Sequence, residues 1–132
     1  MSLDRDSTHP GYLLGRLFAA LENAQLTALG RVNASIKDRY FGSASATPAS
    51  VFPILVRNAQ HHLSNIRKGD RPGLAQHIEA EISQIIGGLN EQFPKSLGIE
   101  AQGRFAIGYY HQRESRFTKK QSENTPAESA TP

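Results

Sequence analysis

The 132-residue chain has no cysteine, no tryptophan and one methionine. The lack of cysteine excludes disulfides and thiolate chemistry, so we expect a reducing compartment, the cytosol. No apolar run approaches the roughly 20 residues that a membrane-spanning helix needs, and residues 1–6 lack the apolar core of a signal peptide. Hydrophobic residues make up only 38% of the chain. Such a low share favours thin helical layers or reliance on partner proteins.

Sequence motifs of catalysis and of metal binding are also missing. The chain has no P-loop, no G-x-G-x-x-G and no G-x-S-x-G. Glu79 and Glu81 are two residues apart, so they diverge on a helix and do not form a carboxylate pair. The histidines are His9, His61, His62, His77 and His111. His61 and His62 are adjacent and must point to different faces of a helix, so they cannot bind one zinc ion together. We therefore predict no enzyme, no metal site and no cofactor.

The positive charge is concentrated in two segments, although the net charge of the chain is only +3. Residues 31–71 carry seven cationic and two acidic side chains, a net charge of +5. Residues 104–120 carry five and one, a net charge of +4, whereas residues 72–103 carry one and four, a net charge of −3. This segregation favours a basic face for a polyanion. The alternative is an uneven scatter of charge that has arisen by chance.

Hydrophobic periodicity predicts helices and no strand. The expected helices cover residues 10–29, a short segment 33–41, residues 48–68, a segment from 72 that loosens at Gly87–Gly88, and residues 100–116. We expect an all-α bundle of four main helices plus one short helix at residues 10–117. A flexible leader at 1–9 precedes it and a disordered tail at 118–132 follows it, because the tail has no apolar residue larger than alanine.

The predicted core residues follow from the same periodicity. In the first helix the apolar stripe is Leu14, Leu17, Phe18, Leu21 and Ala28, with Arg16, Asn23 and Thr27 on the opposite face. In the last helix Phe105 and Tyr109 point inward. Thr47 and Pro48 form a helix start signal, in which the Thr47 hydroxyl caps an amide and Pro48 takes the first helical position. The small residues at 42–46 before them are expected to form a hinge that lets another backbone approach closely.

Two motifs carry a family resemblance. They are Asp38-Arg39-Tyr40-Phe41-Gly42-Ser43-Ala44-Ser45-Ala46-Thr47-Pro48-Ala49 and Gly108-Tyr109-Tyr110-His111-Gln112-Arg113, with Gln60-His61-His62-Leu63 between them. Together they resemble the C-terminal helical region of the large subunit of the type I-C CRISPR interference complex (Cascade). In such systems that region is also made separately, as the small subunit. The resemblance runs from about residue 11 to residue 117.

The resemblance implies a noncatalytic, all-α subunit that lines the belly of a crRNA-guided complex. Its implied partners are the large subunit, the backbone subunits, a second copy of the chain itself and the crRNA-guided target DNA. The implied role is to support the displaced DNA strand, the target duplex or both. Because R-loop exchange is nearly balanced, contacts to DNA backbones can stabilise it.

The best polar feature is a row on the segment 48–68. Arg57, His61, Ser64 and Lys68 stand at i, i+4, i+7 and i+11, opposite the apolar stripe, and the row spans about 16 Å. Such a row suits contact with a nucleic-acid backbone irrespective of sequence. The alternative is an ordinary solvated helix face. The predicted nucleic-acid-binding residues are Arg57, Arg67, Lys68, Arg71, Lys37 and Arg39, together with Arg113 and Arg116.

A second candidate combines cations with aromatic residues. Lys37, Arg39, Tyr40 and Phe41 could stack bases while their charges hold phosphate. The alternative is core packing, which we expect for Phe41, and Tyr40 is left open. For the whole chain, the alternative function is a purely structural helical adaptor between proteins, with no nucleic-acid contact. A helix-turn-helix regulator is less favoured, because no helix carries the base-reading cluster of a recognition helix.

Overall fold

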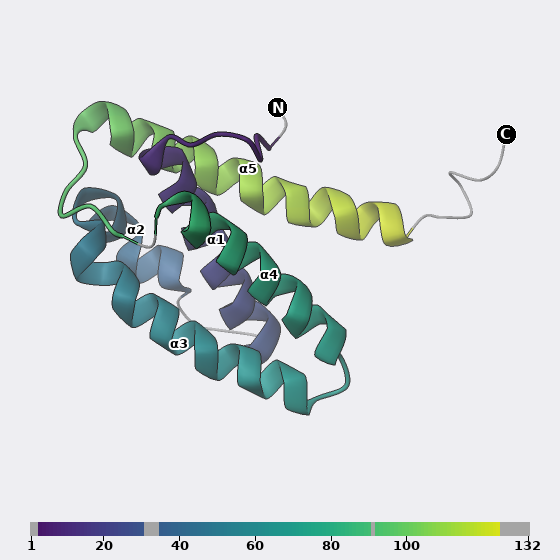
Figure 1. Ribbon diagram of the computed structural model, residues 1–132. Coiled ribbons are helices and arrows are strands. Elements are labelled where there is room, and N and C mark those ends of the chain that lie inside the picture. Colours follow the sequence, from purple (N-terminus) through teal and green to yellow (C-terminus); the bar gives the residue numbers. More distant parts are fainter. Residues whose placement is uncertain (1–2, 31–34, 91, 125–132) are drawn as a thin grey trace, which may run out of the picture.

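The computed structural model describes residues 3–30, 35–90 and 92–124, with the backbone alone for 117–124. This part of the chain forms five helices and no strand: α1 (Pro10–Leu29), α2 (Ile36–Ala46), α3 (Pro48–Lys68), α4 (Pro72–Gly88) and α5 (Ile99–Asn124) (Figure 1). The all-α prediction is confirmed. Among these helices, none is both long and apolar enough to cross a bilayer.

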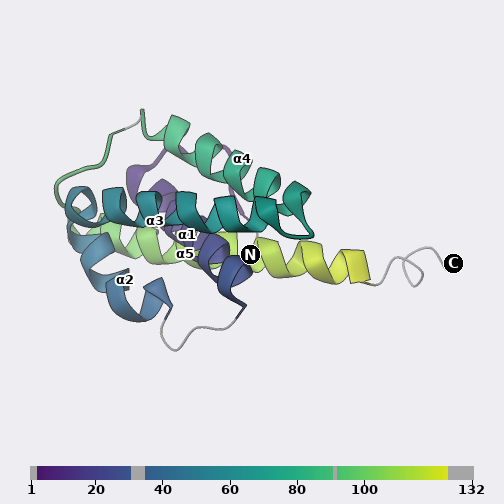
Figure 2. The ribbon, with the colours of Figure 1, turned by 90° about the horizontal axis from the view of Figure 1, so that it is seen from below.

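Helix α1 is the central element of the bundle. It contacts each of the other four helices, and it passes behind α3 and α4 while α5 runs along its other side (Figures 1 and 2). Every residue from Gly11 to Glu22 is buried. Four residues of the predicted stripe are therefore inside and the fifth, Ala28, is half-buried, but the placement of Arg16 on an outer polar face was wrong. A helix surrounded on all sides has no outer face, so even its one central cation is enclosed.

The closest helix pair is α1 with α5, and glycines permit it. A Cβ built on Gly11 would overlap the carbonyl oxygen of Ala101, and one on Gly15 would overlap that of Phe105. On the facing helix, a Cβ on Gly108 would overlap the carbonyl oxygen of Tyr12. The two backbones can cross this closely only because these three positions lack side chains.

Aromatic rings fill the space where α1, α2, α3 and α5 meet. Phe18 makes edge-to-face contacts with the rings of Phe41, Phe52, Phe105 and Tyr109, with centroids 5.7–6.3 Å apart. The predicted inward positions of Phe105 and Tyr109 are confirmed, since both are fully buried. Phe41 belongs to this core as expected. Tyr40, which the sequence left open, is half-buried and also packs against the core.

The segment between α2 and α3 differs from its prediction. Residues 42–46 continue α2 and form no hinge, and only Thr47 separates the two helices. Alanine and serine tolerate a helix, and Ala44 is fully buried, so packing extends α2 through the small residues. The predicted start at residue 33 falls partly on residues 33–34, which lie outside the described part; α2 begins at Ile36.

The first turn of α3 is hydrogen-bonded by the segment between α4 and α5 and not by the expected Thr47 hydroxyl. The Thr47 hydroxyl does not cap α3; it donates to the carbonyl of Ser43, at 3.0 Å. The amide of Ala49 in the first turn instead donates to the carbonyl of Pro94, at 2.9 Å. The amide of Leu97 donates to the carbonyl of Ala46, at 3.1 Å. The α4–α5 connector therefore satisfies the helix terminus that the Thr47 side chain leaves open.

The N-terminal end of the described chain packs on the bundle, and the C-terminal end continues as helix α5. The amide of Asp4 donates to the hydroxyl of Tyr12, at 2.8 Å, and Arg5 forms an ion pair with Glu81 on α4. At the other end, the predicted stop at Arg116 is too early, because α5 continues to Asn124. No glycine or proline occurs between Arg116 and Pro126 to end the helix sooner. Residues 125–132 of the predicted tail lie outside the described part.

Candidate nucleic-acid interface

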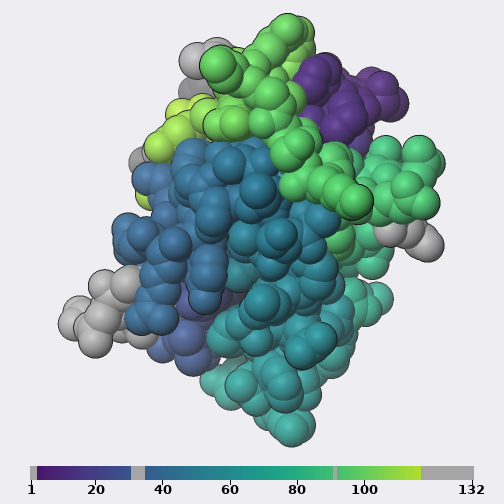
Figure 3. Space-filling model, turned by 90° about the vertical axis from the view of Figure 1, so that its left-hand side faces the viewer, coloured from purple at the N-terminus to yellow at the C-terminus, as the bar shows by residue number. Residues whose placement is uncertain are grey.

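The row predicted on α3 lies on the surface. Arg57, His61 and Lys68 are exposed and Ser64 is half-buried. The buried positions of this helix, Phe52, Leu55, Ala59, Leu63 and Ile66, are on the opposite side. Helices α2 and α3 lie side by side and cover most of one face of the molecule (Figure 3). The solvent-facing side of α3 thus presents two cations about 16 Å apart along one helix.

Arg67, predicted as part of the same site, points to the side of this row. Its guanidinium forms an ion pair with Glu79 of α4, and both side chains are about half exposed. The pair joins α3 to α4 and neutralises the charge of Arg67 locally. Any anion bound here would have to compete with Glu79, so Arg67 is a weaker candidate contact than Arg57 or Lys68.

Lys37 lies where α2 meets α5. Its Nζ is 5.9 Å from the ring centroid of Phe41, 6.0 Å from that of Tyr109 and 5.7 Å from that of Tyr110. These are cation–π distances. Arg39, two residues on, is exposed. The cation–aromatic pairing predicted within residues 37–41 therefore exists, but its partners include two tyrosines from the second family motif.

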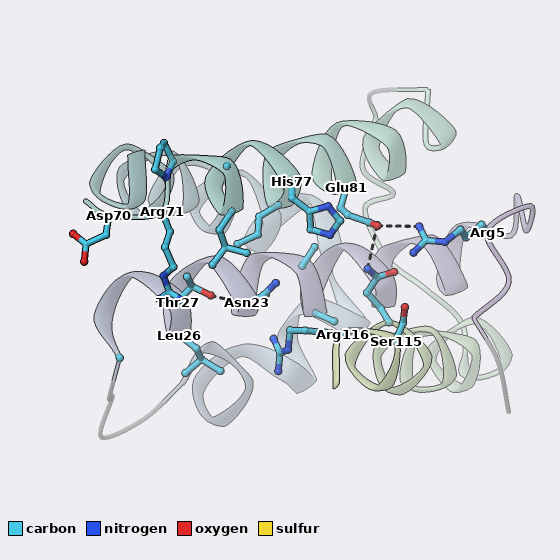
Figure 4. A pocket seen from close by; sticks show the side chains of 18 residues that line it. Arg5, Asn23, Leu26, Thr27, Asp70, Arg71, His77, Glu81, Ser115 and Arg116 are labelled. Carbon is cyan, nitrogen blue, oxygen red and sulfur yellow. Dashed lines mark hydrogen bonds and ion pairs between the residues drawn. The ribbon is translucent and has the colours of Figure 1, made fainter. Parts of the chain in front are cut away.

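Arg71 and Arg116 line a groove of about 990 Å³ between α1, α4 and α5 (Figure 4). Arg71 extends from the start of α4 toward Thr27 of α1, whereas Asp70 points away from the groove (Figure 4). The floor is apolar, with Ala19, Ala20, Leu26, Leu74 and Ile78 among its residues. Of the predicted cations, Arg57 and Lys68 lie on the α3 row, Lys37 lies at the α2–α5 corner, and Arg71 and Arg116 line this groove.

The cations on α5 lie close to an acidic side chain. Burial lowers the pKa of the Arg116 guanidinium, and the charge of Glu22 on α1 opposes that shift. Arg113 is half-buried one turn earlier and also lowers the pKa of Arg116. The charge of Glu22 thus favours the charged form of Arg116 at this part of α5.

A buried polar network was missed at the sequence level. The Arg16 Nε donates to Gln112 Oε1 at 2.9 Å, and its Nη2 donates to Gln84 Oε1 at 3.0 Å and lies 3.7 Å from Glu81 Oε2. Gln112 Nε2 in turn donates to Glu81 Oε2 at 3.2 Å, and Figure 4 shows the contact between Glu81 and Arg5. The available signal was that Arg16 is the one charged residue among residues 11–21.

The second family motif is explained largely by its contacts with α1. Gly108 permits the helix crossing, and Tyr109 donates a 2.6 Å hydrogen bond to Glu22. His111 Nδ1 is 2.9 Å from the hydroxyl of Tyr12, and Gln112 accepts from Arg16. Four of the six motif residues thus face the central helix. Tyr110 is different, because its ring is exposed.

The described residues include no group of three histidine, aspartate or glutamate side chains arranged to hold a metal ion. His62 is half-buried beside the apolar face of α3. Burial, with a smaller contribution from the neighbouring His61, holds its pKa below the ordinary value of 6.5. His62 is therefore neutral at pH 7 and packs as a side chain of the helix flank.

Comparison with known proteins gives one family. No curated protein matches the chain. The sequence profile of the family described as CRISPR-associated protein (Cas_Csd1) matches residues 1–117. The matched region includes all of the aromatic core, the buried Arg16 network and both motifs that carry the resemblance noted above. The chain therefore belongs to the Csd1 family of CRISPR-associated proteins.

Proposed function

We propose that this chain is a noncatalytic, cytosolic small subunit of a crRNA-guided type I-C interference complex. In this proposal it braces neighbouring subunits and binds the DNA backbone, so that the displaced strand or the target duplex is held and the R-loop is stabilised. The observation that carries the proposal is the α3 row, in which exposed Arg57, His61 and Lys68 lie opposite the buried side of the helix. Membership of a CRISPR-associated family supplies the context.

The physical basis is electrostatic. An exposed cation on a rigid helix attracts phosphate without reading sequence, and it releases counterions on binding. R-loop formation exchanges one duplex for another of similar stability, so a small number of backbone contacts can shift its equilibrium. Neither Arg57 nor Lys68 forms an ion pair among the described residues. Their charges are therefore available to a ligand.

The test is target-DNA binding by the assembled complex that contains Arg57→Gln/Lys68→Gln. We expect weaker binding and a salt dependence with a slope lower by about two, because two phosphate contacts are lost. Arg67 is left unchanged, since its substitution would also break the pair with Glu79. The control is Lys95→Gln/Arg104→Gln, which removes the same charge from exposed positions outside the α3 row and also ends the exposed 3.8 Å contact of Arg104 with Glu100. Equal effects of both double variants, or none, would contradict a specific role of the row.

A second candidate function is a structural adaptor that contacts protein only. Ile99 is 90% exposed and Ile107 is 49% exposed on α5. Contiguous exposed apolar surface marks docking sites in proteins, and these two side chains are the candidates for such a surface on α5. Ile99→Ser/Ile107→Ser should then reduce recovery of the chain with the complex, while the α3 variant should not. If complex formation depends on α5 and DNA binding is unchanged in the α3 variant, the adaptor function is favoured.

A further inference from the structure

The two family motifs meet in space at one corner of the bundle. Lys37 and Phe41 come from α2, beside or within the first motif, and Tyr109 and Tyr110 come from the second. The rings of Phe41 and Tyr109 are 5.2 Å apart in an edge-to-face contact, and Tyr109 and Tyr110 are 4.9 Å apart in another. The rings of Phe41, Tyr109 and Tyr110 thus form a series of edge-to-face contacts that leads from the core to the surface.

Tyr110 is the outermost ring of this series. Tyr109 is fully buried, whereas Tyr110 is 45% exposed. The buried ring of Tyr109 contacts the Tyr110 ring edge-to-face, at an interplanar angle of 82°, and so fixes the position of the exposed ring. A solvent-facing aromatic ring that is already positioned loses little conformational entropy when a flat ligand stacks on it.

One cation lies over this ring, and a second follows it along α5. Lys37 Nζ lies 5.7 Å from the centroid of Tyr110, and Arg113 stands one turn further along α5, at i+3. The combination of an exposed ring with neighbouring cations is the arrangement by which proteins bind single strands, in which the ring stacks on a base and the charges hold phosphates.

We propose that Tyr110 stacks on a nucleobase of single-stranded DNA, while Lys37 holds the adjoining phosphate. The bases of a duplex are stacked on one another and cannot reach a side chain in this way. The corner therefore selects a single strand, which deepens and rests on the DNA-backbone function proposed above. Helix α2 contacts both α3 and α5, so this corner adjoins the elements that carry the backbone contacts.

The test compares an oligothymidine with an abasic oligonucleotide of equal length, because the second has the phosphates but no bases. Binding of the full chain to each would be measured by fluorescence anisotropy, for wild type, Tyr110→Ala and the conservative control Tyr110→Phe. Stacking of one base predicts about 5- to 150-fold weaker binding of oligothymidine by Tyr110→Ala. Tyr110→Phe should bind it within about twofold of wild type, because it keeps the ring. Binding to the abasic strand should be unchanged in both variants.

A spectroscopic readout follows from the absence of tryptophan in the chain. Tyr110→Trp introduces one tryptophan at the site, whose emission is distinct from that of the tyrosines. Oligothymidine should quench its emission, whereas the abasic strand should leave it unaltered. The position is exposed, and helical circular dichroism at 222 nm checks that each variant is folded.

The outcomes separate this inference from the function on which it rests. If wild type binds both strands and Tyr110→Ala has no effect, or weakens both equally, the stacking proposal is wrong and backbone binding stands. If wild type binds neither strand at any accessible salt concentration, the stacking proposal fails, and the DNA-backbone function is decided by the assembled-complex test described above. If Tyr110→Ala leaves DNA binding intact but lowers recovery with the other subunits, the exposed ring contacts protein.

Discussion

The hydroxyl of Tyr109 on α5 donates a 2.6 Å hydrogen bond to the Oε1 atom of Glu22 on α1, and both side chains are buried. The bond joins the central helix to the helix that carries the second family motif. Short hydrogen bonds to a buried carboxylate are among the stronger ones in proteins. Glu22 also lies within electrostatic reach of Arg116. Tyr109 thus helps to stabilise a charge inside the bundle.

Tyr109→Phe should destabilise the protein by about 2 kcal/mol, because the Glu22 carboxylate loses a donor in a place that water cannot easily reach. The measurement is urea unfolding followed by circular dichroism. Tyr110→Phe removes a hydroxyl from the neighbouring, exposed ring and serves as the control, with an expected change near zero. Similar losses in the two variants would show that the buried bond contributes nothing particular.

The same pair predicts how stability falls at high pH. Burial, with the hydrogen bond to and the charge of Glu22, raises the pKa of Tyr109 well above its ordinary value of 10.0. The folded state therefore retains a proton that the unfolded chain loses, so this contribution is complete below pH 10 and declines as the pH rises above it. The free energy of unfolding should drop more steeply above pH 10 in wild type than in Tyr109→Phe. Parallel curves would contradict the assignment.

Gly15→Ala should destabilise the bundle, although alanine is the better helix former. The added methyl group would overlap the Phe105 carbonyl oxygen, and overpacking of this kind costs about 1–3 kcal/mol or more. The control is Gly103→Ala on α5, where a Cβ meets nothing within 4 Å. That variant should gain up to about 1 kcal/mol from helix propensity. Opposite signs in thermal or urea unfolding would confirm the close crossing; gains in both variants would refute it.

The ionisation of Glu81 is expected to affect how the free energy of unfolding declines at low pH. Burial alone would raise its pKa, but hydrogen bonds and charges from Arg5, together with Gln112 and Arg16, outweigh burial and hold the pKa below the ordinary value of 4.5. The carboxylate therefore stabilises the fold above pH 4.5, and this contribution disappears as the pH falls through the lowered pKa.

Glu81→Gln should lose about 1.5–3 kcal/mol at pH 7, because buried Arg16 is left without its carboxylate. Its unfolding free energy should also depend less on pH between 5 and 3 than that of wild type. Glu114→Gln, at an exposed position on α5, is the matched control. Equal pH profiles in wild type and Glu81→Gln would assign acid denaturation to other carboxylates.

Local sequence predicted the helices well where periodicity and stop signals agree. Pro48, Gly69 and Pro72 mark the ends of α3 and the start of α4, and the structure places them there. The assignment of faces from hydrophobic periodicity failed for α1, because it assumes that a helix has one buried and one solvated side. Arg16 contradicts that assumption, since α3, α4 and α5 all pack on α1. A charged residue isolated among apolar and small neighbours indicates enclosure, but it does not name its partners.

The candidate interface could be predicted only in part. The α3 row depends on spacing within one helix, so the sequence contained it. The corner of Lys37 and Tyr110 joins residues of two helices that lie far apart in the chain, and no periodicity relates them. Likewise, the Thr47 hydroxyl matched a cap pattern, yet the Pro94 carbonyl satisfies the start of α3 from the α4–α5 connector. Long-range partners of this kind follow from the tertiary fold alone.

The glycine-lined crossing of α1 and α5 also constrains how the protein is made. Helix α1 leaves the ribosome long before α5, and its apolar surface needs the later helix as a cover. Contacts between such distant segments form only after a large loop has closed. The bundle therefore acquires its native packing after most of the chain has emerged. Until then, α1 exposes apolar surface on the nascent chain. Chaperones and other unfolded chains can bind that surface.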